Sequence, residues 1–180
     1  GVKITSHASV VAETVQKILD VTITWKIEAA GKIDADIAVT KDDEFPDLPR
    51  FGVRMFLDKK LSAVRYFGMG PQESYCDKHQ AASHGLYRAD VGDLHEDYIR
   101  PQENGSHYDC EYVELNNSRY GIVVSAENAF SFNASYYTQE ELEEKTHNYE
   151  LTESDSVVFC VDYALNGIGS NSCGPVVLEQ

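Results

Sequence analysis

Two segments near the start of the chain alternate strictly between apolar and polar residues. Residues 21–27 read Val-Thr-Ile-Thr-Trp-Lys-Ile, and residues 33–39 continue the alternation after a glycine-containing break at 29–32. Successive side chains of a strand point to opposite faces, so this period of two predicts a β-hairpin. The residues expected to face the core are Val21, Ile23, Trp25, Ile27, Ile33, Ala35, Ile37 and Val39.

The alternation returns after an acidic linker at 41–49 that holds two prolines. The strands predicted after it are 51–57, 61–67, 108–112, 120–126, 130–136 and 157–163. Turns are predicted at 58–60 and 116–117. Periodicity fades between Gly68 and His107, which predicts a long irregular connection of the kind that is often functional. The Gly68-Met69-Gly70 triplet predicts a turn.

One helix is expected in the whole chain. Thr138, followed three residues later by Glu141, predicts a capping box and a short acidic helix that ends at Glu144 or Lys145. Many short strands with frequent turn signals and a single helix are typical of an all-β fold. The sequence therefore predicts an antiparallel sandwich or barrel with at most one short helix.

Composition narrows the possible partners. The 180 residues are 42% hydrophobic, enough for one compact domain, and carry a formal net charge of −15. This charge excludes nucleic acid and anionic membrane surfaces as partners, because both bind through clustered Lys and Arg. No stretch approaches the roughly 20 apolar residues of a membrane-spanning helix. The chain opens on Gly1 without a methionine, so we expect a processed protein or a piece of a longer one.

The four cysteines are widely spaced and form no Cys-x-x-Cys pair, which predicts free thiols and no structural zinc. Among thirty acidic residues, spacing does not select the two carboxylates that a glycosidase needs. The acid and base of an aldose epimerase could be drawn from His79, His84, Glu73 and Glu103, although residues of these types are more often ordinary surface residues.

The tail at 166–175, Asn-Gly-Ile-Gly-Ser-Asn-Ser-Cys-Gly-Pro, follows the most apolar run of the sequence. Its glycines favour either a plain strand connection or a shaped loop that uses positive φ or close backbone approach. The local residues leave both interpretations open.

Four phrases in one order identify a family. They are Leu-Pro-Arg-Phe-Gly at 48–52, Gly-Met-Gly-Pro-Gln-Glu-Ser-Tyr at 68–75, Ile-Arg-Pro-Gln-Glu-Asn-Gly at 99–105 and Gly-Ile-Gly-Ser-Asn-Ser-Cys-Gly-Pro at 167–175. Together they resemble the C-terminal, small-chain domain of the bacterial β-galactosidases of glycoside hydrolase family 2.

The resemblance implies an antiparallel β-supersandwich of the galactose-mutarotase-like type. Residues 1–180 would then be a single domain and a fragment of a larger enzyme. The family continues with further strands beyond the point where this chain ends, so we expect the domain to be truncated at its C-terminal end.

The resemblance also implies an enzyme that hydrolyses terminal β-D-galactosides such as lactose with retention. Its catalytic glutamates and its Mg²⁺ and Na⁺ sites would lie on a TIM barrel that is absent here, so no catalytic or metal-binding residue is expected in this chain. The implied partners are the remaining domains of the same enzyme, the β-galactoside and further copies in a homo-oligomer. A cytoplasmic location is expected, with the periplasm as the alternative.

What this domain would contribute is a loop at the sugar pocket. The matching residues are Gly169, Ser170, Asn171, Ser172 and Cys173, and the position of Cys173 is a tryptophan that stacks on the sugar in the best-known members. The alternatives are a stand-alone module resembling aldose 1-epimerase and a module for carbohydrate binding or subunit packing.

Overall fold

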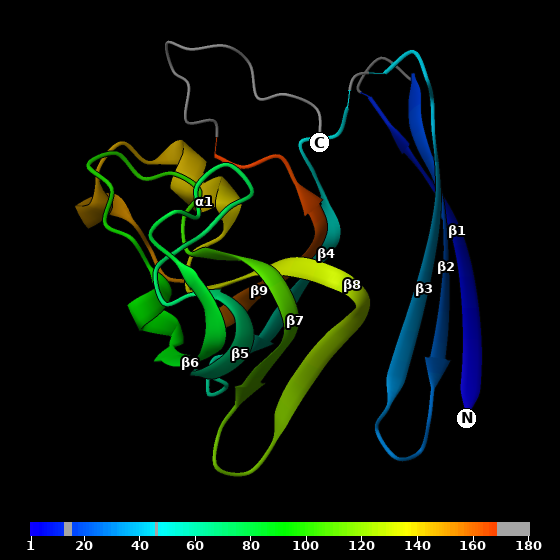
Figure 1. The fold of residues 1–180 in the computed structure, drawn as a ribbon. Coiled ribbons are helices and arrows are strands. Elements are labelled where there is room, and N and C mark those ends of the chain that lie inside the picture. The colour runs from blue at the N-terminus through cyan, green and yellow to red at the C-terminus, as the bar shows by residue number, and fades with distance from the viewer. Residues whose placement is uncertain (13–15, 46, 169–180) are drawn as a thin grey trace. The chain divides into compact units, whose positions relative to one another are not determined.

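The computed structural model describes residues 1–12, 16–45 and 47–168. Its contacts divide the chain into two compact units, Gly1–Leu48 and Pro49–Gln180, and each is described by itself. The described residues form nine strands in two antiparallel sheets with one short α-helix (Figure 1). This confirms the all-β, antiparallel prediction. None of the helices in the described residues is long and apolar enough to cross a membrane.

The first unit is a three-stranded sheet in the order β1-β2-β3, made of β1 (Val2–Val11), β2 (Lys17–Ile27) and β3 (Ile33–Lys41). The predicted hairpin is confirmed, with Trp25 opposite Ala35 and Ile27 opposite Ile33. Strand β1 was not predicted, because Ser6-His7-Ala8-Ser9 interrupts the alternation in its middle. Antiparallel pairing with β2 makes this segment a strand, although its own alternation of apolar and polar residues is interrupted.

The register of the first unit places its apolar residues on one face. Ile4, Trp25 and Ala35 lie side by side across the three strands. The expected burial of this face is not realised. Of the eight residues expected to face the core, none is buried: four are half-buried and four are exposed, with Ile33 keeping 59% of its surface exposed. A single sheet covers one side of a core, and a second layer is needed to complete it.

The second unit is a six-stranded antiparallel sheet in the order β4-β9-β8-β7-β5-β6. Its strands are β4 (Arg50–Asp58), β5 (Ala63–Gly70), β6 (Ser83–Asp90), β7 (Ser106–Asn116), β8 (Gly121–Ser135) and β9 (Ser156–Leu165). The helical segments are η1 (Val91–Leu94), α1 (Gln139–Glu144) and η2 (Asn148–Glu150). The chain order differs from the spatial order, since β9 returns to lie between β4 and β8.

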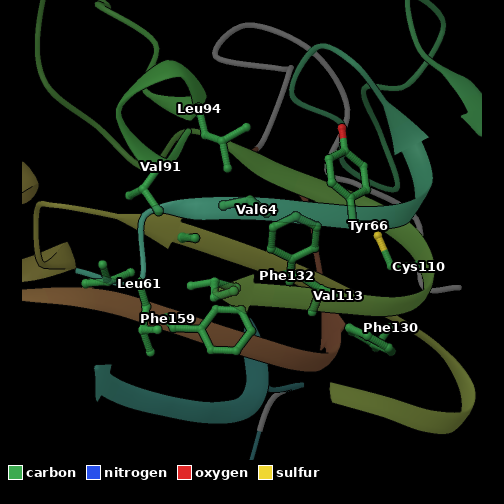
Figure 2. Close-up of a cluster of buried hydrophobic side chains, with 13 residues drawn as sticks. Leu61, Val64, Tyr66, Val91, Leu94, Cys110, Val113, Phe130, Phe132 and Phe159 are labelled. Atoms are coloured by element: carbon green, nitrogen blue, oxygen red, sulfur yellow. The ribbon is translucent and has the colours of Figure 1, made fainter. Parts of the chain in front are cut away.

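The core of the second unit gathers aromatic and aliphatic side chains from β5, β7, β8, β9 and η1 (Figure 2). Tyr66, Phe132 and Phe159 are almost fully buried, and the Tyr66 and Phe132 rings meet edge to face with centroids 5.0 Å apart. Val91 and Leu94 bring η1 onto the same cluster. Burying such side chains removes apolar surface from water and is the main force that holds the unit together.

Three expectations for this unit were wrong. The region between Gly68 and His107 contains strand β6, which is an edge strand with Leu86 55% exposed and therefore has little apolar alternation. Gly68 and Gly70 belong to β5 rather than to a turn. The two strands predicted at 120–126 and 130–136 are one continuous strand, β8.

Helix α1 confirms the predicted position of the only α-helix in the described residues, and Thr138 caps it by accepting a hydrogen bond from Glu141 N at 3.1 Å. The reciprocal half of the capping box is absent. The Glu141 carboxylate instead accepts a hydrogen bond from Thr152 N at 2.8 Å. Glu141 therefore links the helix to the segment before β9.

Candidate functional site

The first three phrases of the sequence and the start of the tail contact one another in the second unit. Arg50 begins β4, and its guanidinium contacts Glu103 of the third phrase. Glu73 of the second phrase accepts a hydrogen bond from Gly105 N at 2.9 Å. Asn166 N, at the start of the tail, donates to Pro49 O at 3.0 Å. Segments far apart in the sequence thus form one polar cluster.

Arg50 holds two carboxylates in this cluster. Its Nε and Nη2 atoms donate to the two oxygens of Asp162 at 2.8 and 2.7 Å, and Nη1 donates to Glu103 at 3.2 Å. Burial opposes the charge on Arg50, but these carboxylates outweigh it and raise its pKa. Burial raises the pKa of Glu103, against the pull of Arg50. A bidentate pair of this kind fixes geometry as well as charge.

Gly52 makes room for this pair. A Cβ atom on Gly52 would overlap both Asp162 Oδ1 and the carbonyl oxygen of Val161, and the β4–β9 ladder shifts register between Phe51 and Gly52. The glycine of the first phrase is therefore required by the close approach of a buried carboxylate. Asp162 is the residue that sequence reasoning missed, although a charged residue inside the apolar run 157–163 was a usable signal.

Glu73 is the centre of a second set of contacts. Its carboxylate accepts hydrogen bonds from Lys78 Nζ at 2.5 Å, from the Tyr98 hydroxyl and from Gly105 N, and the Tyr75 hydroxyl lies 3.4 Å away. Burial alone would raise the pKa of Glu73, but the donated hydrogen bonds outweigh burial and lower it. The Glu73 side chain is only 5% exposed, so it is a fixed, ionised anchor.

A cavity of ≈ 470 Å³ adjoins Glu73. It is lined by Gln72, Glu73, Lys78, His79, Gln80, Ala81, Glu96 and Tyr98. Amide, ammonium, carboxylate and phenol groups of this kind suit the hydroxyls of a sugar or water, and they hold no arrangement typical of a metal site. In the described part of the chain no group of three or more His, Cys, Asp or Glu side chains could hold a metal ion.

The structure places two of the four residues considered for acid and base chemistry at the same cavity. Glu73 and His79 line the cavity, and Glu103 belongs to the Arg50 cluster. His84 lies apart from them in its contacts, since its Nε2 atom is 3.1 Å from Asp109 O and its ring packs edge-on against Phe67. The two glutamates are occupied by Lys78 and Arg50 and do not form an acid and base pair.

The predicted pocket loop, Gly169, Ser170, Asn171, Ser172 and Cys173, lies outside the described residues. The chain that leads to it is described as far as Ile168, whose backbone N–H donates to Asp77 Oδ1 at 3.4 Å. The thiols of Cys76, Cys110 and Cys160 are free, as expected, and Cys173 also lies beyond the described range.

Fold and site together define an all-β, antiparallel protein whose second unit carries a polar cluster built from separated segments of the sequence. The sequence model of the protein family described as beta galactosidase small chain matches residues 2–180. The chain belongs to the β-galactosidase small-chain family.

Relatives from bacteria and yeast agree with this assignment. The chain is 48% identical over its full length to a β-galactosidase of Actinobacillus pleuropneumoniae and covers 18% of that protein. It is 38% identical to one of Staphylococcus xylosus, over 96% of this chain and 17% of the relative. A β-galactosidase of Kluyveromyces lactis is 31% identical over 84% of this chain and 15% of its own length. The chain spans less than a fifth of these relatives.

Proposed function

We propose that this chain is the small-chain part of a β-galactosidase of glycoside hydrolase family 2 that hydrolyses terminal β-galactosides such as lactose with retention. In this proposal the chain performs no chemistry alone and supplies the loop Gly169, Ser170, Asn171, Ser172 and Cys173 to the sugar pocket. The remaining domains, including a TIM barrel with Mg²⁺ and Na⁺ sites, are its partners, and the intact enzyme is a homo-oligomer. The β-galactosidase relatives support this assignment.

The observation that supports the non-catalytic role is that Glu73 and Glu103 already have hydrogen-bonding or ionic partners within the chain. A retaining glycosidase needs one carboxylate free to attack and a second that can donate a proton, about 5 to 5.5 Å apart. Both oxygens of Glu73 already accept hydrogen bonds, and Glu103 is paired with Arg50. These carboxylates stabilise the fold of the polar cluster, so the reacting groups belong to another part of the enzyme.

The tail supports the pocket role. Its root at Gly167 and Ile168 lies against the loop that follows the second phrase, and that loop also lines the polar cavity. A loop that leaves the domain at this point starts beside hydrogen-bonding groups suited to sugars. A cysteine at position 173 supplies little stacking surface compared with an aromatic ring.

The experiment is the substitution Cys173→Trp in the intact enzyme, with lactose kinetics as the measurement. An aromatic ring that stacks on the sugar contributes about 0.5 to 1.5 kcal/mol, so KM should fall roughly twofold to tenfold. Cys173→Ala, which adds no ring, is the matched control and should leave KM within about twofold of the wild type.

Unchanged kinetics in Cys173→Trp would refute the pocket role of the loop. The purified chain provides the second arm of the experiment, since it should neither hydrolyse lactose nor accelerate the mutarotation of fresh α-galactose. Acceleration of mutarotation would instead support the epimerase-like alternative.

A further inference from the structure

Three hydrogen bonds hold Leu165 and the first described residues of the tail. Leu165 O accepts from the Cys76 thiol at 3.2 Å, Asn166 N donates to Pro49 O at 3.0 Å, and Ile168 N donates to Asp77 Oδ1 at 3.4 Å. Two of the three partners, Cys76 and Asp77, are neighbours in the sequence. The exit of the tail is therefore fixed mainly by one short segment.

Cys76 and Asp77 are the two central residues of a tight turn. Tyr75 and Lys78 close it through paired backbone hydrogen bonds of 2.8 and 3.1 Å. The flanking residues are themselves anchored, since Lys78 binds Glu73 and the Tyr75 ring is buried. The turn presents a thiol and a carboxylate to the tail from a rigid base, and positions held in this way place their partners precisely.

Gly167 shows how closely the turn approaches the tail. Its φ of +84° lies in the left-handed region, where a side chain is strained. A Cβ atom at this position would also overlap both oxygens of the Asp77 carboxylate. The glycine thus serves two needs, a backbone bend and close contact with Asp77.

We propose that Cys76 and Asp77 are positioning residues that set the direction in which the chain leaves Ile168. They would thereby act on the loop that the proposed function assigns to the sugar pocket. This inference rests on the proposed function. As positioning residues, they would act on affinity through the loop.

The test is Asp77→Ala in the intact enzyme, with Asp77→Asn as the conservative variant. Alanine removes the acceptor for Ile168 N–H, whereas asparagine keeps a carbonyl oxygen at the same place. In the alanine variant, hydrogen exchange of a peptide that covers Leu165 to Ile168 should become faster. KM for lactose should rise about twofold to tenfold, the equivalent of one hydrogen bond, with kcat unchanged.

The asparagine variant should restore slow exchange and most of the KM. Asp155→Ala is the matched control, because Asp155 is exposed and precedes β9 at the end opposite the tail. It should change neither measurement. If Asp77→Ala does not fold, Cys76→Ala, with Cys76→Ser as its donor-keeping partner, asks the same question of Leu165 O.

Exchange that stays slow in Asp77→Ala would overturn the positioning role. The positioning role would also be overturned if Asp77→Ala exchanged faster but kept its KM while Cys173→Trp changed KM. In that case the proposed function would stand. An unchanged KM in both Asp77→Ala and Cys173→Trp would overturn both proposals.

Discussion

At the scale of single residues, the polar cluster depends on charges that are removed from water. Asp162 is 2% exposed, and both of its carboxylate oxygens are occupied by Arg50. A buried pair of this kind adds little to stability compared with a well-packed apolar pair, but breaking it leaves a charge without compensation. The cluster is therefore sensitive to the loss of one partner.

Arg50→Ala should lower the free energy of unfolding by about 3 to 5 kcal/mol, because Asp162 remains buried without its cation. Urea unfolding of the purified chain measures this. Arg54→Ala on the same strand is the matched control: the Arg54–Glu140 pair is 39% and 67% exposed, and its loss should cost at most about 1 kcal/mol. Equal losses in the two variants would contradict a special role for the buried pair.

At the scale of elements, strand β5 is shaped by how closely its neighbours approach. Gly68 lies opposite Gly85 of β6, and a Cβ atom on Gly68 would overlap the Cys110 thiol and lie 2.9 Å from Cys110 Cα on β7. Two glycines close together in the sequence predict a turn when only local residues are considered. In the structure they belong to β5, and Gly68 has no room for a side chain because Cys110 of β7 fills that space.

Gly68→Ala should cost about 1 to 3 kcal/mol, because the backbone of Cys110 has to move to accept the methyl group. Gly85→Ala is its partner across the ladder and the matched control. The nearest atom to its Cβ would be the Tyr87 hydroxyl oxygen at 3.3 Å, which belongs to a side chain and not to the backbone, so we expect a cost below about 1 kcal/mol. Chemical denaturation compares the two. A larger loss at Gly85 would show that the close approach of β7 is not the limiting contact.

At the scale of the whole molecule, stability should depend on pH through groups buried in the second unit. His107 is almost fully buried, 3.1 Å from the Tyr66 hydroxyl and 3.3 Å from Met69 O, and burial lowers its pKa from 6.5 to about 4. Below pH 6.5 the unfolded chain binds a proton that the folded chain does not. The contribution of neutral His107 to the free energy of unfolding is therefore complete above pH 6.5 and is lost as pH falls towards 4.

The expected loss between these pH values is about 3 kcal/mol, and His107→Gln should remove it from the slope of stability against pH. Unfolding midpoints across this range, with His7→Gln on the exposed strand β1 as the control for the substitution, provide the measurement. A parallel slope in His107→Gln and wild type would contradict the assignment. Glu73, whose pKa is lowered, acts in a lower window, with stability lost as pH falls below about 4.5.

The two units differ in how completely they use their apolar residues. The second unit encloses its cluster between the sheet and η1, whereas the first unit presents a sheet face on which Val2 and Ile33 are 60% and 59% exposed. The alternation predicted strands β2 and β3 of the first unit, but the face that it marks as core-facing stays exposed at Ile27, Ile33 and Val39. Whether that side is covered depends on which layers the chain can bring to it.

The sequence by itself determined the features that local periodicity encodes. The alternating segments predicted the β2–β3 hairpin, and Thr138 predicted the start of α1. These signals succeed because the side chains of a strand or a cap interact within a few residues. The family was likewise recognised from four short sequence phrases, and the family model confirms it.

Only the tertiary structure decided which polar residues form the site. Arg50 and Asp162 are 112 positions apart, and Asp77 meets the tail 91 positions later. No local pattern records such pairs, because they arise when β9 returns between β4 and β8. The same long-range packing turned Gly68 from an expected turn into a strand residue, and it paired the candidate glutamates Glu73 and Glu103 with Lys78 and Arg50.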